Sequence, residues 1–321
     1  MVLSGAALLA ALVLPAAADE VKVSYLYKLS NFNGAIPYAS PRIIADRARK
    51  EVYVLTASGV SIFNSSGMEI YRADYDPEVG ALYDAAVDGD GNIIAIVSTG
   101  KGPVITVCNY RLEPQRTIEL RNLPPEFAGF SPNQLRYRDG RLYLASYGEM
   151  KIVVTDLKGG FIKGYDIFAI LTAEFLDDKI EEKGPGVMRA ISRADYGIDG
   201  FNVDARGNMI FVIPVTGRGC RLSPEGTATQ FGKRGSAPGK FGIPSGIVAD
   251  DAGNYLVSDK LRGVVLIFNN DLKFVSEFSS FGGRDDYLVG PSTMDMDGDG
   301  KLYVGQTAGR GVHVYRLGGN D

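Results

Sequence analysis

Six segments between residues 41 and 316 follow one pattern, and this repeat limits the possible folds more than any other feature of the chain. Each copy contains three apolar runs separated by a tight turn and a loop, as in "GIVADDAGNYLVSDKLRGVVLIFN" at residues 246–269. The first run of each copy ends at an anchor residue, and the anchors are Asp46, Asp88, Arg138, Asp204, Asp250 and Asp297. Their spacings of 42, 50, 66, 46 and 47 residues are typical of β-propeller blades.

The pattern within each copy predicts a four-stranded blade. Residues one and three positions before each anchor are apolar in all six copies, which indicates the packed face of an inner strand. Second runs such as "NIIAIV" and "NMIFVI" are apolar on both sides, as expected for strands that neighbouring sheets cover on both faces. A weaker fourth run follows most copies. We therefore predict an all-β fold, a six-bladed β-propeller.

The two ends of the chain are predicted to share the last blade. The sixth copy ends at residues 317–321, with no room for a fourth strand, whereas "VKVSYLYKL" at residues 21–29 resembles a strand without a partner. We predict that residues 21–29 form the outer strand of the last blade and so close the ring.

The longest spacing holds an insertion between blades 3 and 4, at about residues 166–196. Ile167, Leu171, Phe175 and Ile180 recur at helical spacing, so we predict a helix at 167–182. Its other face is acidic and consists of Glu174, Asp177, Asp178, Glu181 and Glu182. The helix either packs on the rim of the propeller or acts as a lid or a docking site for a partner.

The fifth copy carries a more specific signature. Residues 231–269, "FGKRGSAPGKFGIPSGIVADDAGNYLVSDKLRGVVLIFN", contain Phe-Gly, Gly-x-Phe, Pro-x-Gly-Ile, Asp-x-x-Gly-Asn and Ser-Asp elements. This segment resembles an NHL repeat, and the six copies together cover about residues 40–317. The resemblance implies one NHL-like six-bladed domain, here expected over residues 19–321. It leaves the function open, because such propellers bind ligands, proteins or nucleic acids and occasionally act as enzymes.

The first 18 residues, "MVLSGAALLAALVLPAAA", resemble an export signal. Their apolar stretch is too short to span a bilayer and ends in small residues before Asp19. We therefore predict an exported, periplasmic or extracellular monomer without a transmembrane anchor. The alternative is a misassigned start or an internal buried strand. Nucleic acid is a poor partner for an exported protein, so none is expected.

Cysteine and histidine usage limits the possible chemistry. Cys108 and Cys220 are the only cysteines and show no C-x-x-C spacing, so we expect free buried thiols rather than a zinc or haem site. His313 is the only histidine, and it lies in a third run. A zinc site on several inner-strand His, as in the related lyase that cleaves peptidyl-hydroxyglycine, cannot therefore form. We predict no metal and no cofactor.

Two acidic motifs begin like calcium-binding loops, at residues 88–92 and 295–300. Both fall in the predicted turn after an inner strand, and Gln306 stands where the second motif would require a bidentate Glu. We interpret both motifs as hairpin turns.

Polar side chains two and four positions before the anchors are predicted to face the central channel. With one residue a step earlier, they are Arg42, Asp84, Gln134, Arg136, Asp199, Asn202 and Asp295. Because an unpaired buried charge is costly, these residues either pair as a plug that joins the blades or bind a ligand or an ion. Lactonases of the senescence-marker type bind calcium with Glu, Asn and Asp at this mouth, a composition that this set partly resembles.

A second set of candidate residues lies in the loops between second and third strands. These basic residues are Lys101, Lys151, Arg218, Arg262 and Arg310. Lys233, Arg234 and Lys240 are expected on the same face, with acidic turns on the opposite face. Such a face can attract an anionic glycan, a lipid head group or an acidic protein. The alternative is that these cations pair with neighbouring blades.

We therefore expect an exported NHL-like propeller that acts as a binding or scaffolding module for an anionic ligand or a partner protein. The alternative is a calcium-dependent or other metal-dependent hydrolase or lyase with its site at the channel mouth.

Overall fold

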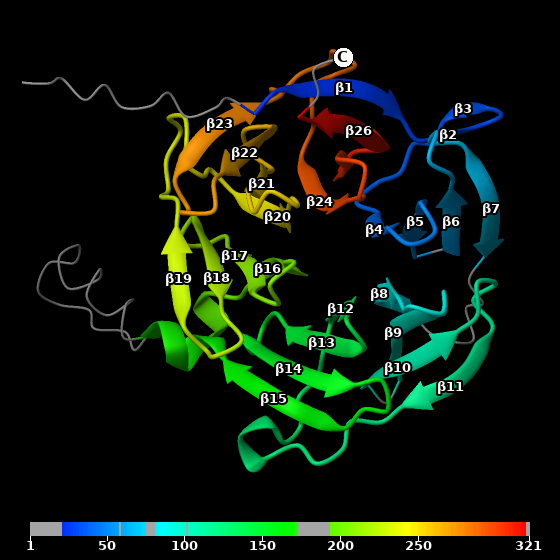
Figure 1. The fold of residues 1–321 in the computed structure, drawn as a ribbon, viewed down its shortest axis with the longest axis vertical. Coiled ribbons are helices and arrows are strands. Elements are labelled where there is room, and N and C mark those ends of the chain that lie inside the picture. Colours follow the sequence, from blue (N-terminus) through cyan, green and yellow to red (C-terminus); the bar gives the residue numbers. More distant parts are fainter. Residues whose placement is uncertain (1–20, 58, 75–80, 101, 173–192, 319–321) are drawn as a thin grey trace, which may run out of the picture.

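The computed structural model describes residues 21–57, 59–74, 81–100, 102–172 and 193–318, and these form a ring of six four-stranded antiparallel sheets (Figure 1). The predicted six-bladed β-propeller is thus confirmed. In each blade one strand lies next to the central axis and the others follow outward. The predicted export signal lies outside the described residues. None of the described helices is long and apolar enough to cross a membrane.

Blades 1 to 5 each run along the chain from the inner to the outer strand. Blade 1 consists of β4 (Arg42–Asp46), β5 (Glu51–Thr56), β6 (Gly59–Phe63) and β7 (Glu69–Asp74). Blade 2 consists of β8 (Ala81–Val87), β9 (Ile93–Thr99), β10 (Gly102–Cys108) and β11 (Pro114–Ile118). Blade 3 consists of β12 (Gln134–Arg138), β13 (Arg141–Ser146), β14 (Lys151–Asp156) and β15 (Phe161–Asp166).

Blade 4 consists of β16 (Asp199–Val203), β17 (Met209–Ile213), β18 (Arg218–Leu222) and β19 (Ala228–Phe231). Blade 5 consists of β20 (Pro244–Ala249), β21 (Tyr255–Asp259), β22 (Val264–Phe268) and β23 (Phe274–Phe278). Blade 6 combines β24 (Pro291–Met296), β25 (Lys301–Gln306) and β26 (Val312–Leu317) with β1 (Val23–Lys28). Outside the blades, β2 (Ser30–Asn31) and β3 (Gly34–Ala35) form a short hairpin. The described helical segments are residues 167–172 and two single-turn 3-10 helices, Pro125–Phe127 and Arg193–Asp195.

The ring closes as predicted, because β1 pairs antiparallel with β26 (Figure 1). Val23 lies opposite Leu317 and Tyr25 lies opposite Tyr315. Leu29, directly after β1, is fully buried and packs between blades 6 and 1. The first and the last described strands therefore belong to one sheet.

The anchor residue builds the turn after the inner strand in the five blades where it is Asp. In the fifth blade, Asp250 Oδ1 accepts a hydrogen bond from the Asn254 amide N–H at 2.7 Å, and Asp250 Oδ2 accepts one from Asn254 Nδ2 at 2.7 Å. Gly253 between them has φ of +88°, a conformation that favours glycine. Asp88 and Asp204 accept the same pair of hydrogen bonds from Asn92 and Asn208. The calcium-like motif at residues 88–92 is thus a hairpin turn, as expected.

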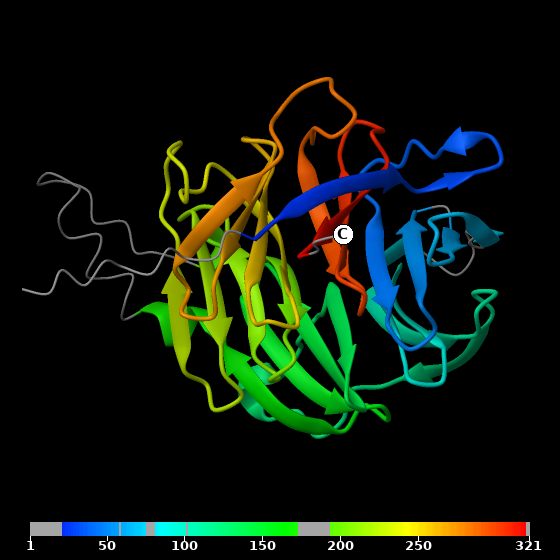
Figure 2. The same ribbon diagram turned by 45° about the horizontal axis from the view of Figure 1, so that its top comes forward.

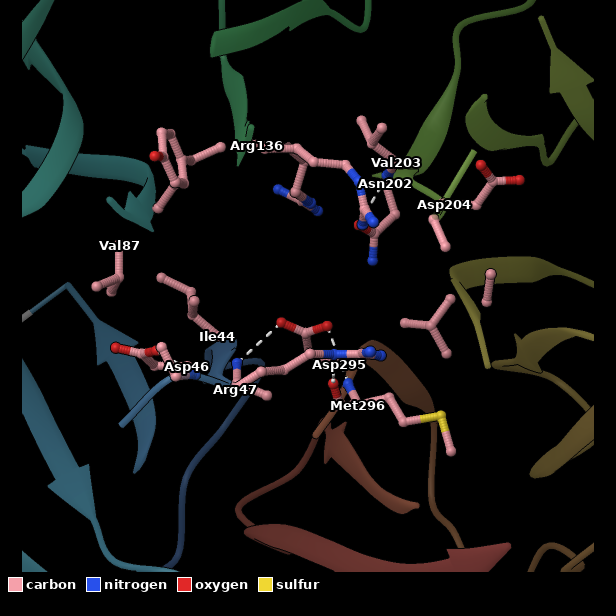
Figure 3. Close-up of a pocket in the computed structure, with 18 of the residues that line it drawn as sticks. Ile44, Asp46, Arg47, Val87, Arg136, Asn202, Val203, Asp204, Asp295 and Met296 are labelled. Atoms are coloured by element: carbon pink, nitrogen blue, oxygen red, sulfur yellow. Dashed lines mark hydrogen bonds between the residues drawn. The ribbon is translucent and has the colours of Figure 1, made fainter. Parts of the chain in front are cut away.

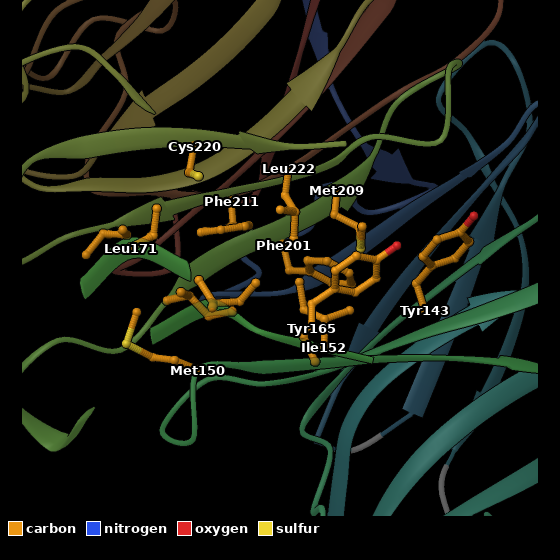
Figure 4. Packing of buried hydrophobic residues seen from close by; sticks show 14 of the residues in the cluster. Tyr143, Met150, Ile152, Tyr165, Leu171, Phe201, Met209, Phe211, Cys220 and Leu222 are labelled. Atoms are coloured by element: carbon orange, nitrogen blue, oxygen red, sulfur yellow. The ribbon is translucent and has the colours of Figure 1, made fainter. Parts of the chain in front are cut away.

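The core lies between neighbouring blades, and Figure 4 shows the part between blades 3 and 4. Ile152 from β14, Phe201 from β16 and Phe211 from β17 meet there without exposure to solvent. Ile167 and Leu171 from the predicted insertion pack into the same cluster. The start of the insertion is therefore a rim-packing helix, whereas residues 173–192, with all five predicted carboxylates, lie outside the described residues.

Cys108 and Cys220 are buried thiols that form no disulfide, as predicted. They belong to separate clusters, one beside blades 1 and 2 and one between blades 3 and 4. Burial raises the pKa of the Cys108 thiol to about 11, which keeps it protonated near neutral pH.

His313 in β26 gives a prediction for the pH dependence of stability. It is fully buried, and burial, with Lys28 and Arg310 nearby, lowers its pKa from 6.5 to about 4, although Asp285 and Asp286 oppose this shift. The folded protein thus favours the neutral ring, while the unfolded chain binds a proton near pH 6.5. The contribution of His313 to the free energy of unfolding is fully present above pH 6.5 and is lost as the pH falls toward 4. We expect the free energy of unfolding to drop by about 2–3 kcal/mol over this window.

Urea denaturation from pH 7 to pH 4 measures this drop, and the His313→Leu variant is the matched control because it cannot bind the proton. The difference in unfolding free energy between parent and variant isolates His313 from the carboxylates. A difference that does not change with pH would contradict the prediction.

Candidate functional site

Three of the predicted channel residues meet at the axis and come from the inner strands of blades 1 to 3. Asp84 in β8 is fully buried and accepts hydrogen bonds from Arg42 Nε, from Arg136 Nη1 at 2.8 Å and from the Leu135 amide N–H at 2.8 Å. The side chains of Arg42 and Arg136 are each 12% exposed. One carboxylate therefore joins two guanidinium groups and three blades.

Arg136 is the least satisfied member of this Arg42, Asp84 and Arg136 cluster. Its Nη1 atom also donates to the Leu135 carbonyl at 2.6 Å, but its buried Nε atom has no hydrogen-bond partner within the described part of the chain. The guanidinium carbon lies 5.8 Å from the centre of the Phe201 ring. Burial, followed by the charge of Arg42, lowers the pKa of Arg136 from its ordinary value. The position thus favours an additional negative partner.

The cluster separates two cavities, because Arg42 and Arg136 line both of them. The larger cavity, of about 410 Å³, opens on the turn face, which we define as the face that carries the turns after the inner strands. Figure 3 shows Arg136, Asn202 and Asp295 reaching into it from blades 3, 4 and 6. This turn-face cavity holds four of the seven predicted channel residues.

Two of these residues are held by the backbone rather than by other side chains. Asp295 Oδ2 accepts from the Ala45 amide at 2.9 Å, and its Oδ1 accepts from the Met296 amide at 2.9 Å. Asn202 Nδ2 donates to the Ile247 carbonyl at 3.4 Å. These contacts fix both side chains in the cavity wall while leaving further lone pairs and protons for a ligand.

The smaller cavity, of about 220 Å³, opens on the opposite face, the loop face, which carries the connections between blades and the loops between second and third strands. Gln134 and Asp199 line it, together with Tyr83 and Tyr147, which were not predicted. The Tyr147 hydroxyl accepts from the Phe201 amide at 3.1 Å, and burial, with Asp199 nearby, raises its pKa. Tyr147 directly follows the second strand of blade 3, β13. The alternation of the inner strands therefore could not predict that its side chain faces the channel.

Asp199 in the smaller cavity differs from Asp84 because it faces one cation, Lys260, rather than two arginines. Burial raises its pKa, although Lys260 and the Gly200 amide oppose the shift. Lys260 Nζ lies 3.7 Å from Asp199 Oδ2, and the Gly200 N–H donates to Oδ1 at 2.8 Å. Among the described residues, no three His, Cys, Asp or Glu side chains lie close enough together to hold a metal ion.

The predicted basic residues of the loop face make contacts within the protein. All four described members donate to a backbone carbonyl in a neighbouring connection: Lys151 to Glu126 at 2.8 Å, Arg218 to Gly232 at 2.8 Å, Arg262 to Lys240 at 2.8 Å and Arg310 to Arg284 at 3.1 Å. Arg262 also pairs with Glu277. These contacts to connections between blades support the alternative in which the cations pair with neighbouring blades. Lys101 lies outside the described residues.

Comparisons with known proteins relate this ring to propeller enzymes. No family model matches the sequence. A streptogramin B lyase shares 14% identity with a TM-score of 0.59, and the match covers 94% of this chain and 99% of that chain. A gluconolactonase, XC5397 from Xanthomonas campestris, shares 13% identity with a TM-score of 0.53 over 96% of this chain and 94% of that chain. The chain is therefore similar in fold to a lyase and to a lactonase, and at these identities the likeness concerns the fold alone.

Proposed function

We propose that this protein is a binding module that holds a small hydroxylated anion, such as a sugar acid, in the turn-face cavity. The observation that carries the proposal is the pairing of two largely buried arginines, Arg42 and Arg136, with the single carboxylate of Asp84. Asp84 already accepts from Arg42, Arg136 and a backbone amide, so it has little capacity left for the buried Nε of Arg136. A ligand carboxylate at the Arg136 guanidinium would add a negative partner for the two arginines beside Asp84 and the nearby Asp295.

The rest of the cavity wall supports a ligand that also carries hydroxyl groups. Asp295 and Asn202 are held by backbone groups, and Figure 3 shows both side chains directed into the space beside Arg136. A carboxylate accepts a hydrogen bond from a ligand hydroxyl, and an amide both donates and accepts. A sugar acid combines these groups with a charged end, whereas a neutral sugar leaves Arg136 without its partner.

Isothermal titration of the purified chain with gluconate, inorganic phosphate and glucose tests the proposal. We expect gluconate to bind more tightly than either alternative and Arg136→Met to weaken gluconate binding by about tenfold or more. Arg116→Met, on the exposed outer strand β11, is the matched control. Should Arg136→Met fail to fold, Asn202→Ala is expected to weaken gluconate but not phosphate. Equal binding of gluconate and glucose, or no effect of either cavity variant, would refute the proposal.

A second candidate function, hydrolase or lyase, is favoured by the smaller cavity and by the fold neighbours. Asp199 with a raised pKa is a candidate proton donor, and Tyr147 lies in the same cavity. A catalytically inactive His-to-Ala variant is described for the virginiamycin B lyase of Staphylococcus aureus. Here the single His313 lies in the third strand of blade 6 and lines neither channel cavity. Stoichiometric calcium that only a chelator removes, together with hydrolysis of gluconolactone lost in Asp199→Asn, would favour the enzyme.

A further inference from the structure

The loop face exposes an unusual share of large apolar side chains. Among the described residues ten such side chains are exposed, and six of them lie on connections or strand ends that the propeller topology places on the loop face. These six are Phe32, Tyr83, Val215, Ile243, Leu261 and Phe281. Exposed apolar residues that gather on one face mark an interaction surface.

Three of them lie together at the loop-face end of blade 5 and on the connections that enter and leave it. The Lys260 amide donates to the Ile243 carbonyl at 2.9 Å, which places Leu261 beside Ile243. Gly263, in the same loop as Leu261, has no room for a side chain because the Phe281 backbone lies 2.7 Å from where its Cβ would be. Leu261 is 64% exposed and Phe281 is 61% exposed. We call Ile243, Leu261 and Phe281 the apolar ridge.

A basic loop lies beside the apolar ridge. Residues 232–243 join blades 4 and 5 and contain Lys233, Arg234 and Lys240 but no Asp or Glu. All three side chains are exposed. In Figure 2 this loop and the connection that carries Phe281 project from the same side of the ring, as does the β2 and β3 hairpin. Phe32 lies between these two strands and is 95% exposed.

We propose that the loop face docks on an anionic lipid surface, with Phe32 and the apolar ridge entering the interface and the basic loop contacting acidic head groups. Apolar tips combined with flanking cations are the composition by which proteins bind membrane surfaces. Phe32 and the apolar ridge lie on different parts of the ring. A lipid surface can accept apolar side chains at any spacing, whereas a protein partner needs a matching pocket for each of them. This surface is separate from the turn-face cavity, so the two proposals stand independently.

Co-sedimentation with vesicles of phosphatidylcholine, alone or with equimolar phosphatidylglycerol, tests the docking. We expect the parent chain to bind the vesicles that contain phosphatidylglycerol and to be released by added salt. Leu261→Ser with Phe281→Ser should reduce this binding by about tenfold. The matched control is Ile70→Ser with Tyr110→Ser, two side chains of similar exposure that lie outside the loop face. That control should bind as the parent does.

The basic loop has its own variant pair. Lys233→Glu with Lys240→Glu should abolish the preference for phosphatidylglycerol, whereas Lys158→Glu with Lys273→Glu, in turns of the opposite face, should preserve it. Melting curves identify any variant that is unfolded. If the ridge variant or the basic-loop variant is unfolded, the vesicle binding of the other one tests the proposal. The proposal would be overturned if the parent chain bound neither kind of vesicle. It would also be overturned if the ridge variant and the basic-loop variant both bound as the parent does. Self-association of the parent that the ridge variant abolishes would overturn it as well, because that outcome assigns the surface to a protein contact.

Discussion

A variant that lacks residues 21–29 is expected to lose on the order of 5 kcal/mol of unfolding free energy or to remain unfolded. The deletion removes β1, which exposes the edge of β26 and the apolar side chains behind it. It also removes Leu29, whose burial alone contributes about 1.5–3 kcal/mol. Thermal and urea melting followed by circular dichroism measure the loss.

The control for this deletion is Phe32→Ala, which changes an exposed residue in the neighbouring hairpin. Its melting temperature should match that of the parent chain. A deletion variant that also melts like the parent would show that closure of the ring does not depend on β1.

Asp84→Asn is expected to destabilise the protein by about 3–5 kcal/mol, because it leaves two largely buried guanidinium groups without the carboxylate of Asp84. The substitution keeps the shape of the side chain, so the loss reports the charge rather than a cavity. Urea denaturation at neutral pH measures it. Asp139→Asn is the matched control, since that carboxylate is 85% exposed and should contribute less than about 1 kcal/mol.

A second substitution separates charge from packing at the same position. Combining Asp84→Asn with Arg42→Met removes one of the two stranded cations and should recover part of the lost stability. If the double variant is instead less stable by the sum of the two single losses, the two side chains act independently, and the description of the cluster as one electrostatic unit is wrong.

The turns and strands could be predicted from the sequence because contacts between residues close together in the chain determine them. Each anchor Asp forms its turn with residues at most four positions away, so the turn and the strand alternation are visible in a single copy. The alternation also places Arg42, Asp84 and Arg136 on the channel side of their strands. That these three meet in one hydrogen-bonded cluster depends on the order of blades around the axis.

Contacts that depend on how loops fold back could not be predicted in the same way. Tyr147 and Lys260 approach the axis from loops after second strands, where no periodicity indicates direction. The spacing of Arg218, Arg262 and Arg310 correctly places them between second and third strands, with Arg262 and Arg310 in the loop and Arg218 at the first residue of β18. Their guanidinium groups donate to backbone carbonyls of other connections, and sequence composition contains no information about that geometry.

The shared sheet of β1 and β26 also imposes an order of events on a chain that is made from its N-terminus. Tyr25 can pair with Tyr315 only after β26 has been synthesised, so β1 leaves the ribosome early and lacks its cross-strand partner while blades 1 to 5 are made. Blades 1 to 5 can each assemble from consecutive strands as they appear, whereas the sixth requires contacts across the whole described chain. Completion of the ring is therefore a late step of folding, and until that step the edges of β1 and β26 lack their cross-strand partners.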